Sequence, residues 1–125
     1  RLKIAQRLSD QRPAHLPPLN LCVQVKLSDE PSKSGVASSE LPNLAEQIVK
    51  LPKLRLRGLM AIPAATADYP EQRRSFRKLQ GLLLELQKQH PQADTLSMGM
   101  SGDLEAAVVE GSTLVRVGTD IFGAR

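Results

Sequence analysis

Apolar residues recur along the chain with two alternating periods, one typical of helices and one typical of strands. Residues 1–10 carry apolar side chains at helical spacing, and prolines from Pro13 onward end that pattern. Residues 19–27 (LNLCVQVKL) alternate as a strand does, and residues 54–62 (LRLRGLMAI) repeat the alternation up to Pro63. The pattern therefore predicts a helix, a strand and, further along, a second strand.

The rest of the chain continues this alternation. The pattern predicts a polar loop at 28–39, helices at 41–51, 70–90 and 101–110, and strands at 94–98 and 113–117. The helix at 70–90 has a clear apolar stripe, formed by Phe76, Leu79, Leu82, Leu83 and Leu86. No internal repeat is visible.

Alternating helices and strands joined by short loops indicate an α/β fold of parallel βα units in one domain, residues 1–125. A doubly wound sheet and a (β/α)₈ barrel both fit this order. Four predicted strands are too few for a closed barrel, which typically needs about 250 residues. The pattern thus leaves two possibilities open, a small open sheet or half of a barrel.

Composition is that of a globular chain, with 41% apolar, 24% charged and only 2% aromatic residues. No apolar run approaches the roughly 20 residues that span a bilayer, and no signal-peptide segment is visible, so a cytoplasmic protein is expected. The single cysteine, Cys22, is interpreted as a core residue, and the isolated His15 and His90 do not suggest a metal site.

A net charge of +4 raises the question of nucleic-acid binding. The basic residues gather in two groups, Lys53, Arg55 and Arg57, and Arg73, Arg74, Arg77 and Lys78. Phe76 is the one interleaved aromatic, whereas a nucleic-acid surface would offer several rings for stacking. The charges are therefore interpreted as solvated.

Function in α/β proteins collects where parallel strands end. The third and fourth predicted strands end in SMGMSGDLE and RVGTDIFG, each with a glycine and a hydroxyl residue. Gly99 would allow close backbone approach, Ser101 would cap the helix that follows, and Gly118 and Thr119 would offer N–H groups and a hydroxyl. Such a set is typical of a phosphate site, although Ser101 as a plain helix cap and Gly118–Thr119 as a plain turn are open alternatives.

Arg116 favours the functional interpretation. Strand alternation predicts that Leu114, Arg116 and Gly118 share one face, with Val115 and Val117 on the other. A guanidinium on the inner face must be paired or bound to a ligand. Its partner would be a bound ligand or a carboxylate, Glu105 or Asp120.

The stretch SMGMSGDLEAAVVEGSTLVRVGTDIFGAR resembles the closing motif of the pyridoxal-phosphate homeostasis protein family (the YggS/PROSC group). LRLRGLMAIP and SDEPSKSG also match, so the resemblance covers essentially the whole chain. It implies an alanine-racemase-like (β/α)₈ TIM barrel that binds pyridoxal 5′-phosphate (PLP), of which this chain would be the C-terminal half.

The resemblance also assigns roles within the predicted site. Ser101, Gly118 and Thr119 would hold the cofactor phosphate, and Gly99 and Met100 belong to the same cofactor-binding loop. Arg116 would face the pyridine nitrogen, where a permanent cation disfavours protonation of the ring. That arrangement suits a carrier of PLP within the cell more than an enzyme, and no catalytic residue is assigned.

The family's Schiff-base lysine lies on an early strand that this chain does not include. Lys33 is the alternative lysine, although a lysine in a polar loop is more simply solvated. A racemase-like PLP enzyme and a module for another phosphate ligand are the alternatives to PLP homeostasis. Tyr69 is the only tyrosine and has no evident place as a second proton donor.

The start at Arg1 rather than methionine also suggests a fragment. Half of a barrel would leave strand edges at 19–27 and 113–117 unpaired. The chain is therefore expected to form a homodimer, to aggregate, or to need its N-terminal half. PLP-dependent apoenzymes are possible recipients of the cofactor.

Overall fold

The helices and the first three strands that the periodicity predicts all form, in the predicted order. The computed structural model describes residues 1–27, 34–118 and 121. In chain order, the elements are α1 (Leu2–Gln11), β1 (Leu19–Lys26), β2 (Val36–Ala37), the 3₁₀ helix η1 (Ser38–Glu40), α2 (Leu41–Val49), β3 (Leu54–Met60), α3 (Tyr69–Gln87), β4 (Thr95–Ser97) and α4 (Leu104–Val109).

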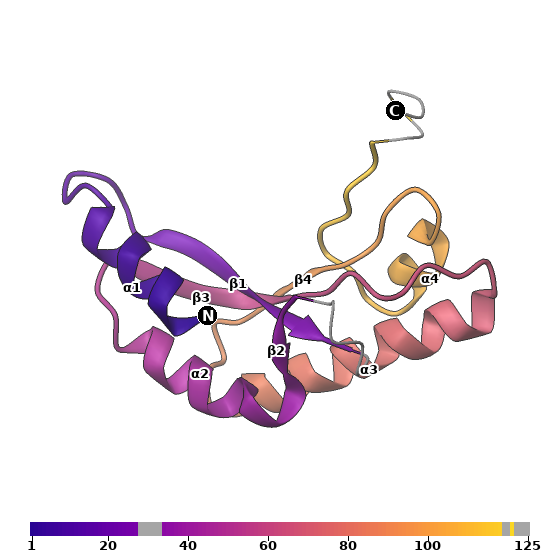
Figure 1. Ribbon diagram of the computed structural model, residues 1–125, viewed down its shortest axis with the longest axis horizontal. Coiled ribbons are helices and arrows are strands. Elements are labelled where there is room, and N and C mark those ends of the chain that lie inside the picture. The colour runs from indigo at the N-terminus through magenta and orange to yellow at the C-terminus, as the bar shows by residue number, and fades with distance from the viewer. Residues whose placement is uncertain (28–33, 119–120, 122–125) are drawn as a thin grey trace.

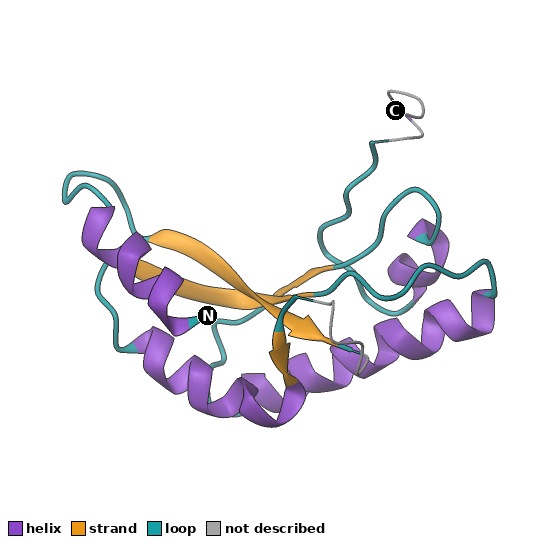
Figure 2. Cartoon of the chain, in the orientation of Figure 1, coloured by secondary structure: helices purple, strands orange, loops and turns teal. Residues whose placement is uncertain are grey.

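The strands form one parallel four-stranded sheet in the order β2-β1-β3-β4. Helix α2 connects β2 to β3, and α3 connects β3 to β4, as parallel pairing requires. Both helices lie along the same face of the sheet (Figures 1 and 2). A barrel wall has its helices on one face, whereas a doubly wound sheet has them on both. The arrangement therefore favours part of a barrel.

The core lies between this sheet face and the helices α2 and α3. Phe76 and Leu79 of α3 are fully buried, as are Leu56 and Leu59 of β3. Burying one such side chain stabilises the fold by about 1.5–3 kcal/mol. The apolar stripe predicted from the helical period is thus the stripe that packs on the sheet.

Strand β3, which pairs with both β1 and β4, contains a bulge. The pairing of β1 with β3 shifts between Leu21 and Cys22, which leaves Arg57 as the extra residue. The next residue, Gly58, pairs with Thr95 of β4. A Cβ at Gly58 would lie 1.8 Å from the carbonyl oxygen of Thr95, so only glycine fits there.

The prediction of a regular last strand at 113–117 is wrong. This segment forms a single parallel bridge, between Ser97 and Leu114. Side chains take over part of the hydrogen bonding: the Leu96 N–H donates to the Thr113 hydroxyl at 2.8 Å, and the Ser112 hydroxyl lies 2.6 Å from the Met98 carbonyl oxygen. A regular ladder would have used backbone groups throughout.

Two further expectations about the first strand are corrected. The loop predicted at 28–39 contains β2, whose two residues pair with Val25 and Lys26, so the edge of β1 is partly covered. Cys22 is exposed and not a core residue, because it alternates with the buried Val23. Partial desolvation nevertheless raises the pKa of its thiol, against the lowering effect of Arg57.

Candidate functional site

The turn after β4 is built around Gly99. Its φ is +105°, a conformation that residues with a Cβ rarely adopt. A Cβ on Gly99 would lie 2.6 Å from the Cβ of Ala107 in α4 and 3.3 Å from Cγ1 of Val115. Glycine therefore lets the turn, α4 and the last segment pack against one another.

Arg116 lies beside this turn. Its backbone N–H donates to the carbonyl oxygen of Gly99 at 2.9 Å, which joins two segments that the sequence placed in one site. Leu114, Arg116 and Gly118 are exposed, whereas Val115 and Val117 are half-buried. The predicted alternation is thus confirmed, although the segment is not a regular strand.

The Arg116 side chain makes no hydrogen bond or ion pair with any other residue in the described ranges, Glu105 included. Asp120, the other carboxylate weighed as its partner, lies outside those ranges, as do Thr119 and Lys33. Within the part of the chain that is described, the Arg116 side chain is exposed and pairs with no carboxylate.

Ser101 is half-buried in the turn but does not cap α4. Asp103 occupies the N-cap position, and the helix begins at Leu104, three residues later than predicted. The Asp103 carboxylate accepts from the Met100 N–H at 2.7 Å, and the Asp103 N–H donates to the Met100 carbonyl oxygen at 3.2 Å. The turn is thus closed internally by Asp103, which engages the N–H of Met100.

Gln72 is a polar residue of this region that the sequence pattern did not single out. It lies in the first turn of α3 and is only 8% exposed. Its Nε2 donates to the carbonyl oxygens of Thr66, at 2.7 Å, and Gly102, at 3.3 Å. No periodic signal marks it, because it lies among other polar residues of the helix start.

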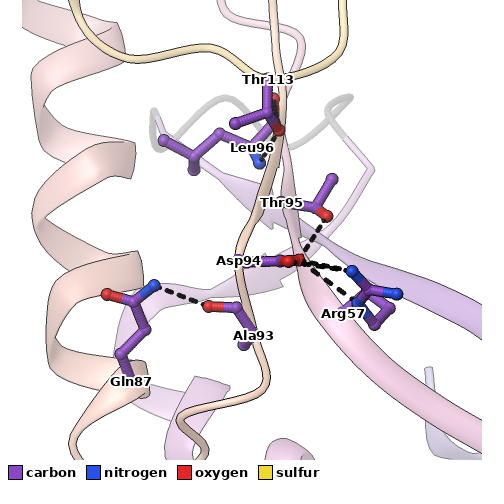
Figure 3. Close-up of polar contacts among 7 residues, drawn as sticks. All are labelled: Arg57, Gln87, Ala93, Asp94, Thr95, Leu96 and Thr113. Atoms are coloured by element: carbon purple, nitrogen blue, oxygen red, sulfur yellow. Dashed lines mark hydrogen bonds and ion pairs between the residues drawn. The ribbon is translucent and has the colours of Figure 1, made fainter.

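An ion pair joins the middle of β3 to the residue before β4, Asp94, at the amino-terminal end of that strand. Arg57 contacts both carboxylate oxygens of Asp94, each at 2.9 Å, and the Thr95 hydroxyl also donates to Asp94 (Figure 3). Hydrogen bonds from Arg57 and then from Thr95 lower the pKa of Asp94. The pair joins neighbouring strands away from the predicted site.

A second ion-pair cluster joins α3 to α4. The Glu110 carboxylate is 6% exposed and accepts from Nε of Arg73 at 2.7 Å and from Nε of Arg77 at 3.2 Å. These hydrogen bonds, first from Arg77 and then from Arg73, lower the pKa of Glu110. With Arg57 also paired, these three arginines are not merely solvated, and that interpretation was wrong for them.

No helix in residues 1–27, 34–118 and 121 is both long and apolar enough to cross a bilayer. In the same ranges, no group of three or more histidine, cysteine or acidic side chains is placed to hold a metal ion.

A parallel sheet with helices on one face and loops gathered at its carboxyl edge defines a segment of a (β/α)₈ barrel. Residues 1–125 match the family described as alanine racemase, N-terminal domain, and the chain belongs to that family. The family and the barrel fold expected from the sequence are thus confirmed.

Individual relatives support the same family assignment. A pyridoxal phosphate homeostasis protein of Pseudomonas aeruginosa is 62% identical over 125 residues, which are 100% of this chain and 53% of the relative. PipY of Synechococcus elongatus, solved with PLP bound, has a TM-score of 0.77 and 35% identity, covering 98% of this chain and 54% of PipY.

An unknown protein from Bifidobacterium adolescentis, solved as a crystal structure, has a TM-score of 0.87 and 35% identity, covering 97% of this chain and 49% of that structure. The chain spans about half the length of the curated relatives it matches, as expected for half of a barrel.

Proposed function

We propose that this chain is the C-terminal half of a PLP-binding barrel that serves intracellular PLP homeostasis, and that it acts in the cytoplasm. The observation that carries the proposal is the hydrogen bond from the Arg116 N–H to the Gly99 carbonyl oxygen, which brings the cofactor loop beside the arginine. The relative from Pseudomonas aeruginosa is named for PLP homeostasis, and PipY has been solved with PLP bound.

The donors of the site suit a phosphate monoester. An anion of this kind is held by backbone N–H groups, hydroxyls and a guanidinium. We assign the phosphate to Ser101, Gly118 and Thr119, with Gly99 and Met100 shaping the loop. The Met100 N–H already bonds Asp103, so Met100 would contribute through its place in the loop and not through that N–H.

Arg116 would orient the cofactor ring and keep its pyridine nitrogen unprotonated. PLP supplies electron-sink chemistry when it is bound, and a permanent cation at the ring nitrogen weakens that capacity. The chain would therefore hold and release its ligand and not turn over a substrate. PLP-dependent apoenzymes are the recipients that this role implies.

Ligand binding tests the proposal. Dissociation constants of PLP, pyridoxal and inorganic phosphate would be measured for the chain and for a chimera that adds the unmatched part of the Pseudomonas aeruginosa relative. We expect PLP to bind more tightly than pyridoxal, and Arg116→Ala to weaken PLP binding. Arg74→Ala is the matched control, because Arg74 is an exposed arginine of α3. Equal affinity for PLP and pyridoxal in both proteins would contradict the proposal.

Borohydride reduction followed by peptide mapping asks whether Lys33 anchors the cofactor covalently. A single adduct at Lys33 that is lost in Arg116→Ala would place a working anchor in this chain. Scattered labelling of lysines would show that the anchor must come from elsewhere, as the family resemblance implies.

The β1 side of the sheet is where a partner could bind. A groove of about 1030 Å³ lies there between α1 and α2, lined by apolar residues that include Ile4, Leu8 and Leu44. We propose that the other half of the barrel or a second copy of the chain covers it. Sedimentation velocity measures whether the chain associates with itself. A monomer that unfolds cooperatively would contradict this proposal.

A further inference from the structure

Gln72 connects two loops at the carboxyl edge of the sheet. Burying a primary amide is costly unless its N–H groups are bonded, and Gln72 is 8% exposed. Both bonds of its Nε2 go to backbone carbonyl oxygens, of Thr66 in the loop after β3 and of Gly102 in the turn after β4. One side chain on α3 therefore ties together two segments far apart in the sequence.

The Thr66 end of this connection is fixed independently. The Thr66 hydroxyl accepts from the Asp68 N–H at 3.2 Å and donates to the Glu71 carboxylate at 3.3 Å. The Gln72 N–H donates to the Asp68 carbonyl oxygen at 3.0 Å, the first hydrogen bond of α3. The loop and the helix start thus form one unit, and Gln72 extends from it to the turn.

At the other end, Gln72 orients a single peptide group. The Gly102 carbonyl and the Asp103 N–H belong to one planar trans peptide, so they point in opposite directions. Gln72 bonds the carbonyl, and the Met100 carbonyl oxygen accepts from the N–H. Fixing the first bond therefore sets the orientation of the turn that contains Ser101.

We propose that Gln72 is a positioning residue for the phosphate-binding turn. It orients the turn through its hydrogen bond to the Gly102 carbonyl oxygen and does not contact the ligand. This inference rests on the proposed function, because it assigns the residue that orients the phosphate site. The ligand concerned is a phosphate monoester, so the effect of Gln72 should depend on the phosphate and not on the ring.

The chain supplies a matched control on the same helix. Gln87 of α3 is also partly buried, and its Nε2 also donates to a backbone carbonyl oxygen, that of Ala93, at 2.7 Å (Figure 3). Ala93 precedes β4, at the amino-terminal end of the strand. Replacing Gln87 therefore removes a similar bond without touching the predicted phosphate turn.

The test compares Gln72→Met with Gln87→Met, since methionine keeps the length of glutamine without its amide. The readout is the ratio of the dissociation constants of PLP and pyridoxal, measured on the chain and the chimera. We expect Gln72→Met to weaken PLP binding about two- to tenfold and to leave pyridoxal binding unchanged. Gln87→Met should leave both unchanged, although each variant lowers thermal stability. Gln72→Leu, which also lacks the donors and adds no charge, should behave as Gln72→Met does.

The outcomes separate the two proposals. If the unchanged protein does not prefer PLP to pyridoxal, the proposed function fails and this inference with it. If that preference exists and both Gln72 variants retain it, the inference alone is overturned. If both Gln72 variants unfold while Gln87→Met folds, Gln72 is a folding requirement, which contradicts a role specific to the ligand.

Discussion

Replacing Gly99 by alanine measures how closely the turn after β4 packs on α4. Alanine at a φ of +105° carries a backbone penalty of about 1–3 kcal/mol. Its Cβ would also lie 2.6 Å from that of Ala107, well inside the roughly 3.5–4.0 Å at which carbon atoms pack. Such overpacking typically costs about 1–3 kcal/mol more. We therefore expect Gly99→Ala to lower the free energy of unfolding by about 2–6 kcal/mol, and to weaken PLP binding because Ser101 moves with the turn.

The assay is urea unfolding followed by circular dichroism, with a double-mutant cycle to separate the two penalties. Ala107→Gly removes the clashing Cβ but leaves the strained φ, so the coupling energy should be about 1–3 kcal/mol. Gly102→Ala is the control in the same turn, because a Cβ there meets nothing within 4 Å. It should change stability by less than about 0.5 kcal/mol. A Gly99→Ala effect no larger than that of Gly102→Ala would refute the reasoning.

Three further substitutions test the rest of the fold. Gly58→Ala should cost about 3 kcal/mol or more in urea unfolding, because its Cβ would lie 1.8 Å from the Thr95 carbonyl oxygen, and an unchanged midpoint would contradict the close approach of β3 and β4. Gly81→Ala, at an open position inside α3, should instead stabilise by about 0.5–1 kcal/mol in the same assay. Glu110 has a lowered pKa, so its contribution to stability is present above the ordinary glutamate pKa and is lost as pH falls through the lowered value. Unfolding measured from pH 6 to pH 3 should therefore show a shallower acid loss in Glu110→Gln, whereas parallel curves would argue against the ion pair.

The sequence predicted those features that have a local period. The stripe of α3 and the two faces of residues 114–118 follow from spacings of 3.6 and 2 residues, and both appear in the structure. Helix α4 shows the limit of local rules. Ser101 is a good cap residue, yet Asp103 closes the turn with two hydrogen bonds to Met100, and the helix starts after it.

Long-range pairings left no local signal. Arg57 and Asp94 are 37 residues apart, and their contact depends on a bulge and on the parallel register of β3 and β4. Glu110 resembles any exposed helical glutamate in the sequence, and its burial follows only from the way α4 packs beside α3. Such contacts require the tertiary arrangement, which the hydrophobic pattern does not specify.

The irregular attachment of residues 113–118 has a consequence for how a ligand enters and leaves. One backbone bridge, the N–H groups of Thr113 and Arg116, and the hydroxyls of Ser112 and Thr113 hold this segment, whereas β1 pairs with β3 at six positions. Segments held by few backbone bonds open locally at a lower free energy than the global one. Residues 113–118, which include Arg116, are therefore expected to open locally while α3 and β3 stay folded. If the chain binds PLP between the turn and Arg116, as we propose, local opening of this segment would let the ligand enter and leave, and binding would appear as slowed amide exchange there.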